Sequence, residues 1–187
     1  MVLTLFALPA CSASESGADR SSPKEPAPLS SSSTASHSTS GGATSKDEAA
    51  KDKALAAYDK FWAAQVAAFR KGSMRGTGVE KYATADALAF VHNGVTRMQK
   101  AGTRSTGAPK HEAKVSTYTP KKPGKAATAT ISDCLSTASW KTVEKDTGKP
   151  VPRPSNVPSS YLVTTKAEDW GKRGWRMLHV SPSSREC

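Results

Sequence analysis

The chain has 187 residues, of which 36% are hydrophobic and only 6% aromatic, so it can build one modest hydrophobic core rather than two. Its 27 Lys and Arg residues outnumber its 16 Asp and Glu residues, and the resulting net charge of +11 favours contact with anionic partners. No run of 18 apolar residues occurs, so we expect no helix that spans a membrane.

The first eleven residues, MVLTLFALPAC, form an apolar stretch that ends at a cysteine and is followed by serine-rich chain. The tetrapeptide LPAC resembles the lipobox of bacterial lipoproteins, in which small residues flank the cleaved bond and the thiol accepts the lipid. The resemblance implies that residues 1–11 are a signal peptide and that Cys11 carries two fatty chains, enough for stable anchoring to the outer face of a membrane. Because no Lys or Arg precedes Cys11, we expect the basic start of the signal to lie upstream of Met1. The alternative is a disordered N-terminus with an incidental thiol.

Once Cys11 is assigned to lipid, Cys134 and Cys187 remain, and an even number of cysteines outside the cytoplasm predicts a disulfide. Closing a loop of this length stabilises a fold by roughly 4 kcal/mol on the chain-entropy argument. The alternative is one buried and one frayed thiol, because the sequence does not show that the two side chains meet.

Residues 12–45 are dominated by Ser, Thr, Pro, Gly and Ala and contain almost no large apolar side chain. Such a segment cannot bury enough surface to offset its ordering entropy, so it is predicted to be a disordered tether. The folded domain is expected over residues 46–187, with Ser45 and Glu48 forming a capping box at its first helix.

The following segment is rich in good helix formers and spaces its large apolar residues by three or four, which predicts an amphipathic helix that stops at Gly72. A second helix is predicted to begin after Thr84 and to stop at Gly102. Because a glycine inside a helix costs about 1 kcal/mol relative to alanine, we expect a kink or break at Asn93-Gly94. The two apolar faces comprise Leu55, Tyr58, Trp62, Val66 and Phe69, and Leu88, Val91, Val95 and Met98.

From residue 110 the sequence alternates between apolar and polar residues, which predicts β-strands. The proline-rich stretch 149–158 cannot be a central strand, because proline offers no N–H to the ladder. Helices followed by a meander predict an α+β fold, with N-terminal amphipathic helices packed on a curved antiparallel sheet of four to five strands. The expected strands are 111–119, 125–134, 138–145, 159–168 and 174–180.

Over about residues 47–187 the chain resembles the cystatin-like or NTF2-like (SnoaL-like) domains of actinobacterial secreted lipoproteins. The resemblance rests on the helix containing AYDKFW, the hairpin ending in SDC and the GW strand running to a terminal cysteine, with a lipobox in front. It implies a conical sheet and an extracytoplasmic, membrane-anchored location, and it leaves a homodimer through the sheet open. It implies no activity, because most such lipoproteins have none assigned.

Some proteins of the NTF2-like fold are isomerases or cyclases that hold an acid and a base inside the cone. A general base must lie within hydrogen-bond reach of the proton that it abstracts, and no spacing in this sequence indicates such a pair. We therefore expect a non-enzymatic binding or accessory module, with a small-ligand cup or enzyme as the alternative. The candidate acid–base residues are Tyr58, His92, Asp133, Tyr161 and His179, and the candidate pocket comprises Tyr58, Trp62, Tyr161 and Trp175.

Each candidate also has a structural interpretation. Tyr58 belongs to the apolar face of a helix, Asp133 is expected to end a strand, and His92 is expected at the surface. His179 alternates with Met177 and is expected to share its buried face. The four histidines form no H-x-H or H-E-x-x-H motif, and there is no Walker loop or G-x-S-x-G, so no metal, cofactor or nucleophile is predicted.

Between residues 97 and 125, eight basic residues face Glu112 as the single acidic one. If the second helix and the first hairpin share a face, these residues form a basic patch for anionic cell-wall polymer or lipid headgroups. Nucleic acid is not expected, because no aromatic residues interleave the lysines. The alternative is a solvated face that keeps the protein soluble. The predicted patch comprises Arg97, Lys100, Arg104, Lys110, Lys114, Lys121, Lys122 and Lys125.

Overall fold

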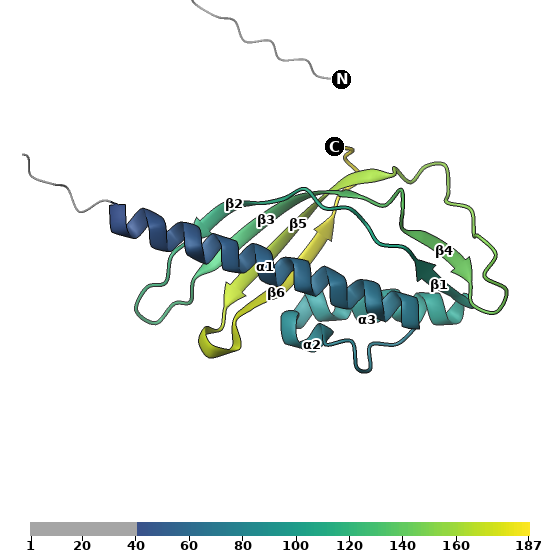
Figure 1. Cartoon of the computed structure of the whole chain (residues 1–187), viewed down its shortest axis with the longest axis horizontal. Helices are drawn as coiled ribbons and strands as arrows, with labels where there is room; N and C mark the ends of the chain where they lie inside the picture. The colour runs from purple at the N-terminus through teal and green to yellow at the C-terminus, as the bar shows by residue number, and fades with distance from the viewer. Residues whose placement is uncertain (1–40) are drawn as a thin grey trace, which may run out of the picture. The chain divides into compact units, whose positions relative to one another are not determined.

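The computed structural model describes residues 41–187 (Figure 1). The expected signal peptide, the expected lipid attachment at Cys11 and residues 12–40 of the expected tether lie outside the described residues, whereas residues 41–45 of that tether belong to helix α1. Within residues 41–187, no helix is both long and apolar enough to cross a bilayer. The elements are α1 Gly41–Lys71, α2 Val79–Tyr82, α3 Ala85–Lys100, β1 Thr103–Thr106, β2 Ala113–Thr119, β3 Thr128–Ser136, β4 Lys141–Glu144, β5 Ser160–Asp169, the 3-10 helix η1 Gly171–Arg173 and β6 Trp175–Pro182.

The architecture is α+β, as the sequence predicts, with helices packed against antiparallel sheets (Figure 1). Strands β2, β3, β5 and β6 form a four-stranded sheet in that order, and β1 pairs with β4 in a separate two-stranded sheet. The expected single meander is therefore wrong, because β5 pairs directly with β3 and β4 leaves the main sheet. The sequence does not predict β1, whose residues TRST are all polar and show no apolar alternation.

Helix α1 contacts α2 and α3 as well as β2, β3 and β6, so it forms the centre of the core. Its predicted apolar face is buried, with Tyr58, Trp62 and Phe69 exposed by 0%, 3% and 9%. The helix begins at Gly41, so Ser45 and Glu48 lie inside it and the expected capping box is wrong. No proline interrupts this region, and a helix already nucleated by packing extends at little cost.

Helix α3 is continuous through Asn93-Gly94, so the break expected there is wrong. Gly94 is buried against Phe69 of α1, and a Cβ added to Gly94 would lie 2.4 Å from Phe69 Cζ. Phe69 is in turn stacked on Trp140, with ring centroids 5.6 Å apart and planes at 12°. The glycine therefore lets α1 and α3 approach closely, which compensates for its low helix propensity.

Replacing Gly94 by alanine is expected to destabilise the fold by about 1 kcal/mol net. Overpacking costs up to about 3 kcal/mol, and the better helix propensity of alanine returns only about 1 kcal/mol. Asn93→Ala, at the neighbouring exposed position, should be neutral or slightly stabilising. Urea unfolding followed by circular dichroism compares the two variants, and equal stabilisation by both would contradict the packing role of Gly94.

Strand β3 pairs with both β2 and β5 and alternates strictly between its two faces. Ile131, Asp133 and Leu135 are all fully buried on the face toward the helices. The expectation that Asp133 ends a strand is therefore wrong, because β3 continues to Ser136. A carboxylate lies among apolar side chains in the middle of the central strand.

A bulge in β6 changes which of its residues are buried. His179 lies opposite Lys166 and Met177 lies opposite Ala167, so Leu178 is an extra residue in the register with β5. A bulge of this kind reverses the alternation of the strand beyond it. His179 is accordingly exposed, and the expectation that it shares the buried face of Met177 is wrong.

Candidate functional site

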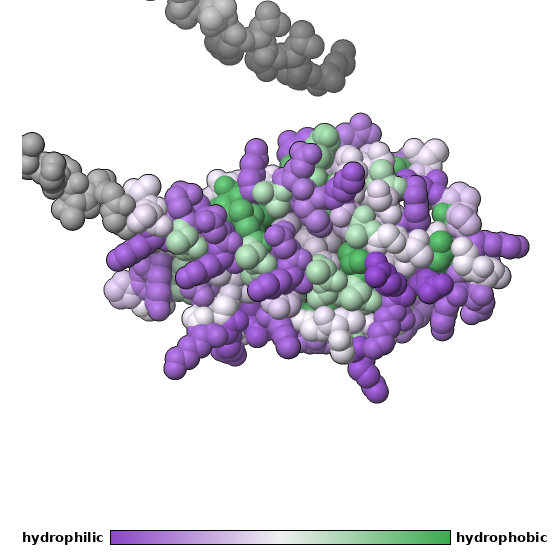
Figure 2. Space-filling model, viewed as in Figure 1, coloured by the Kyte–Doolittle hydropathy of each residue, from purple (hydrophilic) through white to green (hydrophobic). Residues whose placement is uncertain are grey.

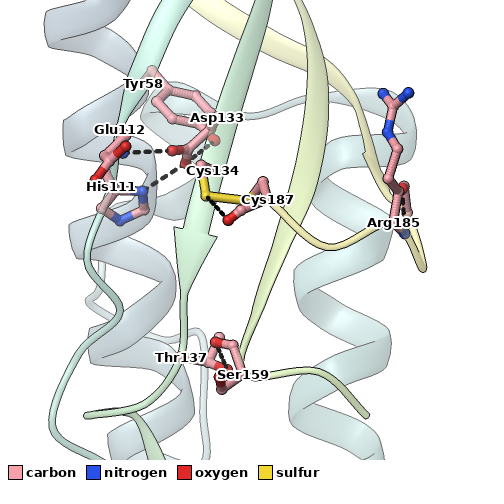
Figure 3. The surroundings of a disulfide bond; sticks show 10 residues. Tyr58, His111, Glu112, Asp133, Cys134, Thr137, Ser159, Arg185 and Cys187 are labelled. Carbon is pink, nitrogen blue, oxygen red and sulfur yellow. Dashed lines mark hydrogen bonds and ion pairs between the residues drawn. A yellow bond between two sulfur atoms is a disulfide. The ribbon is translucent and has the colours of Figure 1, made fainter. Parts of the chain in front are cut away.

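The buried carboxylate of Asp133 joins three parts of the fold (Figure 3). Its Oδ2 accepts a hydrogen bond from the Tyr58 hydroxyl of α1 at 2.8 Å and lies 2.8 Å from Nδ1 of His111. Its Oδ1 accepts a hydrogen bond from the backbone N–H of Glu112 at 2.8 Å. Both oxygens therefore have donors within the protein, and the carboxylate ties α1 and the segment before β2 to the centre of β3.

The environment of Tyr58 keeps its phenol protonated. Burial is the largest cause that raises its pKa, and the negative charge of Asp133 and the hydrogen bond to that carboxylate raise it further. A phenol held in its neutral form remains a hydrogen-bond donor, which is the role that a buried carboxylate requires of its partners.

His111 forms the accessible end of this network, since its side chain is 22% exposed. An ionised carboxylate can only accept hydrogen bonds, so opposite such a carboxylate the N–H group on Nδ1 of His111 is the donor of this contact. Figure 3 shows the second ring nitrogen turned away from Asp133. The ring packs against Trp62, with centroids 5.1 Å apart. Chemically, this is an oriented imidazole whose outer nitrogen can accept a proton.

The structure therefore brings together Tyr58 and Asp133, which sequence reasoning named without pairing them, and adds His111, which it missed. The alternation Ala129, Ile131, Asp133 could have indicated the site, because it places a charged residue on the core face of a strand and such a residue needs buried partners. No comparable pattern marks His111.

The disulfide predicted from the cysteine count is confirmed, because Cys134 and Cys187 are bonded with their Cα atoms 5.8 Å apart (Figure 3). The alternative of one buried and one frayed thiol is wrong. The bond fixes the C-terminal segment beside β5, where Ser183 donates its N–H to the carbonyl of Leu162 and Leu162 donates to that of Arg185.

The four aromatic residues expected to line one pocket do not do so. Tyr58 and Trp62 pack edge-on in the core with centroids 6.2 Å apart. Trp175 packs against Tyr118 elsewhere in the fold. Tyr161 borders a separate groove of about 780 Å³ formed with β4 and the proline-rich loop. The candidate pocket is therefore not formed by these four residues, because the large side chains of α1 fill the space between this helix and the sheet.

None of the remaining acid–base candidates forms a hydrogen bond with Asp133 in the described part of the chain. His92 is exposed on α3. His179 is exposed on β6, with Nδ1 3.3 Å from Oδ2 of Asp86. Tyr161 is half-buried, and burial is the main cause that raises its pKa. Among the described residues, no group of three His, Cys, Asp or Glu side chains could hold a metal ion.

The eight basic residues expected to form one patch are divided. The lysines at positions 121, 122 and 125 lie at the β2–β3 turn, whereas Arg97, Lys100 and Arg104 lie at the end of α3 and in β1, toward the opposite end of the sheet (Figure 1). The patch as expected is wrong, because the antiparallel β2–β3 hairpin projects its turn away from β1. Arg104 instead lines a cavity with Arg70 and Lys145.

Replacing Tyr58 by phenylalanine should lower stability by about 1–3 kcal/mol near pH 7, because Asp133 loses one donor. The difference in the free energy of unfolding between the wild type and this variant should become smaller above pH 10. The unfolded chain releases the phenol proton at its ordinary pKa of 10.0 while the native state keeps it, so wild-type stability falls as pH rises, by up to about 1.4 kcal/mol per pH unit.

Urea unfolding from pH 7 to 11 measures this difference. Tyr118→Phe is the matched control, since burial raises the pKa of Tyr118 as well, and its hydroxyl has no hydrogen-bond partner within the described part of the chain. The control should lose less stability at pH 7. A constant gap between wild type and Tyr58→Phe across this range would contradict the assignment.

No protein-family model matches the sequence, and no curated protein matches it either. Among solved structures, the intermembrane space region of the chloroplast protein ARC6 is similar at a TM-score of 0.43 and 17% sequence identity, covering 71% of this chain and 95% of that one. This likeness is too weak to carry an argument about function.

Proposed function

We propose that this protein is an extracytoplasmic lipoprotein whose domain, of NTF2-like or cystatin-like type, acts as a non-enzymatic binding or accessory module through its surface. The filled interior carries the proposal. Tyr58 and Phe61 are fully buried between α1 and the sheet, where a ligand cup of this fold would lie. A long helix lying along a four-stranded antiparallel sheet is compatible with the NTF2-like arrangement.

Two observations support the location outside the cytoplasm. The sequence LPAC at residues 8–11 resembles a lipobox, and the Cys134–Cys187 disulfide is of the kind that persists in oxidising compartments. The chain isolated from its host should contain no alkylatable thiol before reduction and two after it, with an acyl modification on Cys11. Intact-mass measurement tests this expectation, and three reactive thiols with no acyl group would contradict it.

The net charge of +11 favours anionic components of the cell envelope as the surface partner. The full chain carrying Cys11→Ser, which removes the expected lipid attachment site, should sediment with phosphatidylglycerol vesicles or purified cell wall at low salt and should be released as ionic strength rises, because exposed charges are screened. Phosphatidylcholine vesicles provide the control. Absence of sedimentation with either anionic material at low salt would contradict envelope binding.

One observation favours a second candidate, a small-ligand cup or enzyme. The Asp133–His111 pair orients an imidazole in the manner of a general base. Native mass spectrometry of the protein purified from its host separates the two functions, because a ligand site at His111 predicts a retained small molecule that His111→Gln releases. A binding module of the proposed kind predicts the mass of the chain and its lipid alone, or of a dimer.

A further inference from the structure

We propose that the cavity between the C-terminal end of α1 and the β1–β4 pair binds a phosphate group. This inference rests on the proposed function and assigns the anion a site. The cavity has a volume of about 440 Å³, and no acidic residue lines it. Its lining comprises Arg70, Lys71, Gly72, Gln99, Thr103, Arg104 and Lys145.

Among the described residues, no acidic side chain forms an ion pair with the four cationic side chains of this cavity. The ion pairs found within the described part of the chain involve other residues. Glu144 lies opposite Thr103 in the β1–β4 ladder, but its carboxylate accepts a hydrogen bond from the Thr147 hydroxyl. Four positive charges around one cavity repel one another, and a bound anion would remove that repulsion.

Arg104 offers an unused donor. Its Nε is buried and has no hydrogen-bond partner in the described structure, which is unfavourable for a polar group removed from water. Arg70 donates to the carbonyl of Gly107 at 3.2 Å, and Lys71 donates to that of Arg75 at 2.7 Å. These two contacts restrain the long side chains and leave further N–H groups for a ligand, since a guanidinium carries five donors and an ammonium three.

The C-terminal end of a helix carries partial negative charge, which by itself favours basic residues there. That effect accounts for Arg70 and Lys71, but not for Arg104 in β1 or Lys145 after β4. The nearby carbonyls that would repel an anion are already occupied, since Gly72 accepts from Nε2 of Gln99 at 2.7 Å and Gly102 accepts from the N–H of Lys145 at 2.8 Å.

Three elements that are distant in sequence build the site. The end of α1, strand β1 and the turn after β4 meet at one end of the fold (Figure 1). Figure 2 shows hydrophilic side chains at this end, as over much of the visible face. Several convergent donors, two of them on guanidinium groups, suit the tetrahedral oxygens of a phosphate. Free phosphate, a phosphate ester of an envelope polymer and a phospholipid headgroup share this chemistry.

The test uses the full chain with Cys11→Ser, so that no lipid anchor contributes to vesicle binding, and two charge-matched double variants in the same background. Arg104→Gln with Lys145→Gln removes charge from the cavity, whereas Lys122→Gln with Lys125→Gln removes the same charge from the distant hairpin turn. Calorimetric titration with inorganic phosphate and with glycerol 3-phosphate measures the free anions. Sedimentation with phosphatidylglycerol vesicles measures the headgroup, and unfolding midpoints establish that each variant is folded.

The cavity variant should lose about tenfold or more in affinity, and the hairpin variant about twofold or less. If the protein binds phosphate or glycerol 3-phosphate but not vesicles, the site is supported and its ligand is a free or polymer-linked phosphate ester. If it binds vesicles and only the cavity variant loses this binding, the ligand is a lipid headgroup. If the Cys11→Ser chain binds vesicles and both variants bind them equally more weakly, the cavity is not the binding site. That result contradicts this inference but not the proposed function. Absence of binding to every anion at low salt overturns both.

Discussion

Replacing Asp133 by alanine is expected to lower the free energy of unfolding by about 3–5 kcal/mol. The change leaves the Tyr58 hydroxyl, Nδ1 of His111 and the N–H of Glu112 without their acceptor. It also opens a void at a fully buried position of the central strand. Urea unfolding at pH 7, with the transition followed by tryptophan fluorescence, measures the loss.

A milder substitution keeps this prediction measurable if the alanine variant does not fold. Asp133→Asn retains one acceptor oxygen for the N–H of Glu112 but presents its amide N–H groups to the two other donors. Its stability is therefore expected to lie between those of the wild type and Asp133→Ala. Asp59→Ala, at an exposed position of α1, should change stability by about 0.5 kcal/mol or less. If Asp133→Ala were as stable as Asp59→Ala, the network would have no structural role.

Removing the disulfide is expected to cost about 4 kcal/mol, because the bond closes a loop between residues separated by 53 positions in the sequence. The variant carries Cys134→Ser and Cys187→Ser in a Cys11→Ser background, which prevents exchange with a third thiol. Its stability in urea is compared with that of Cys11→Ser alone, oxidised and after reduction.

The same variant should also loosen the C-terminal segment. The backbone N–H groups of Leu162 and Ser183 are bonded between β5 and that segment, so their hydrogen exchange should accelerate more than that of β3. If the Cys11→Ser protein were equally stable with the disulfide oxidised and reduced, the disulfide would contribute nothing to the free energy of unfolding.

The functional proposals differ in what they require of the molecule. The phosphate site needs only side chains at the ends of α1, β1 and β4, and it is independent of the Asp133 network in the core. Asp133→Asn should therefore leave phosphate affinity unchanged in any variant that folds. The core network and the surface cavity can be tested separately, because they share no residue.

Several elements can be predicted from signals that are local in the sequence. The apolar spacing from Leu55 to Phe69 predicts α1, the glycines at 72 and 102 end the two long helices, and the alternation around Ile131 predicts β3. Cysteine counting predicts the pairing of Cys134 with Cys187, which the fold contains. The acid–base residue Asp133 was visible as a candidate, although its role was not.

Other features depend on contacts between segments that are distant in the sequence, so no local signal predicts them. Glycine is required at position 94 of α3 because the ring of Phe69 occupies the space that a side chain would fill. His179 is exposed because of a one-residue bulge. Strand pairing and register bring Asp133 into contact with His111 and place Arg104 and Lys145 at the same cavity. Local propensity carries no information about which segments meet, since the free energy that selects those pairings comes from burial and packing across the whole domain.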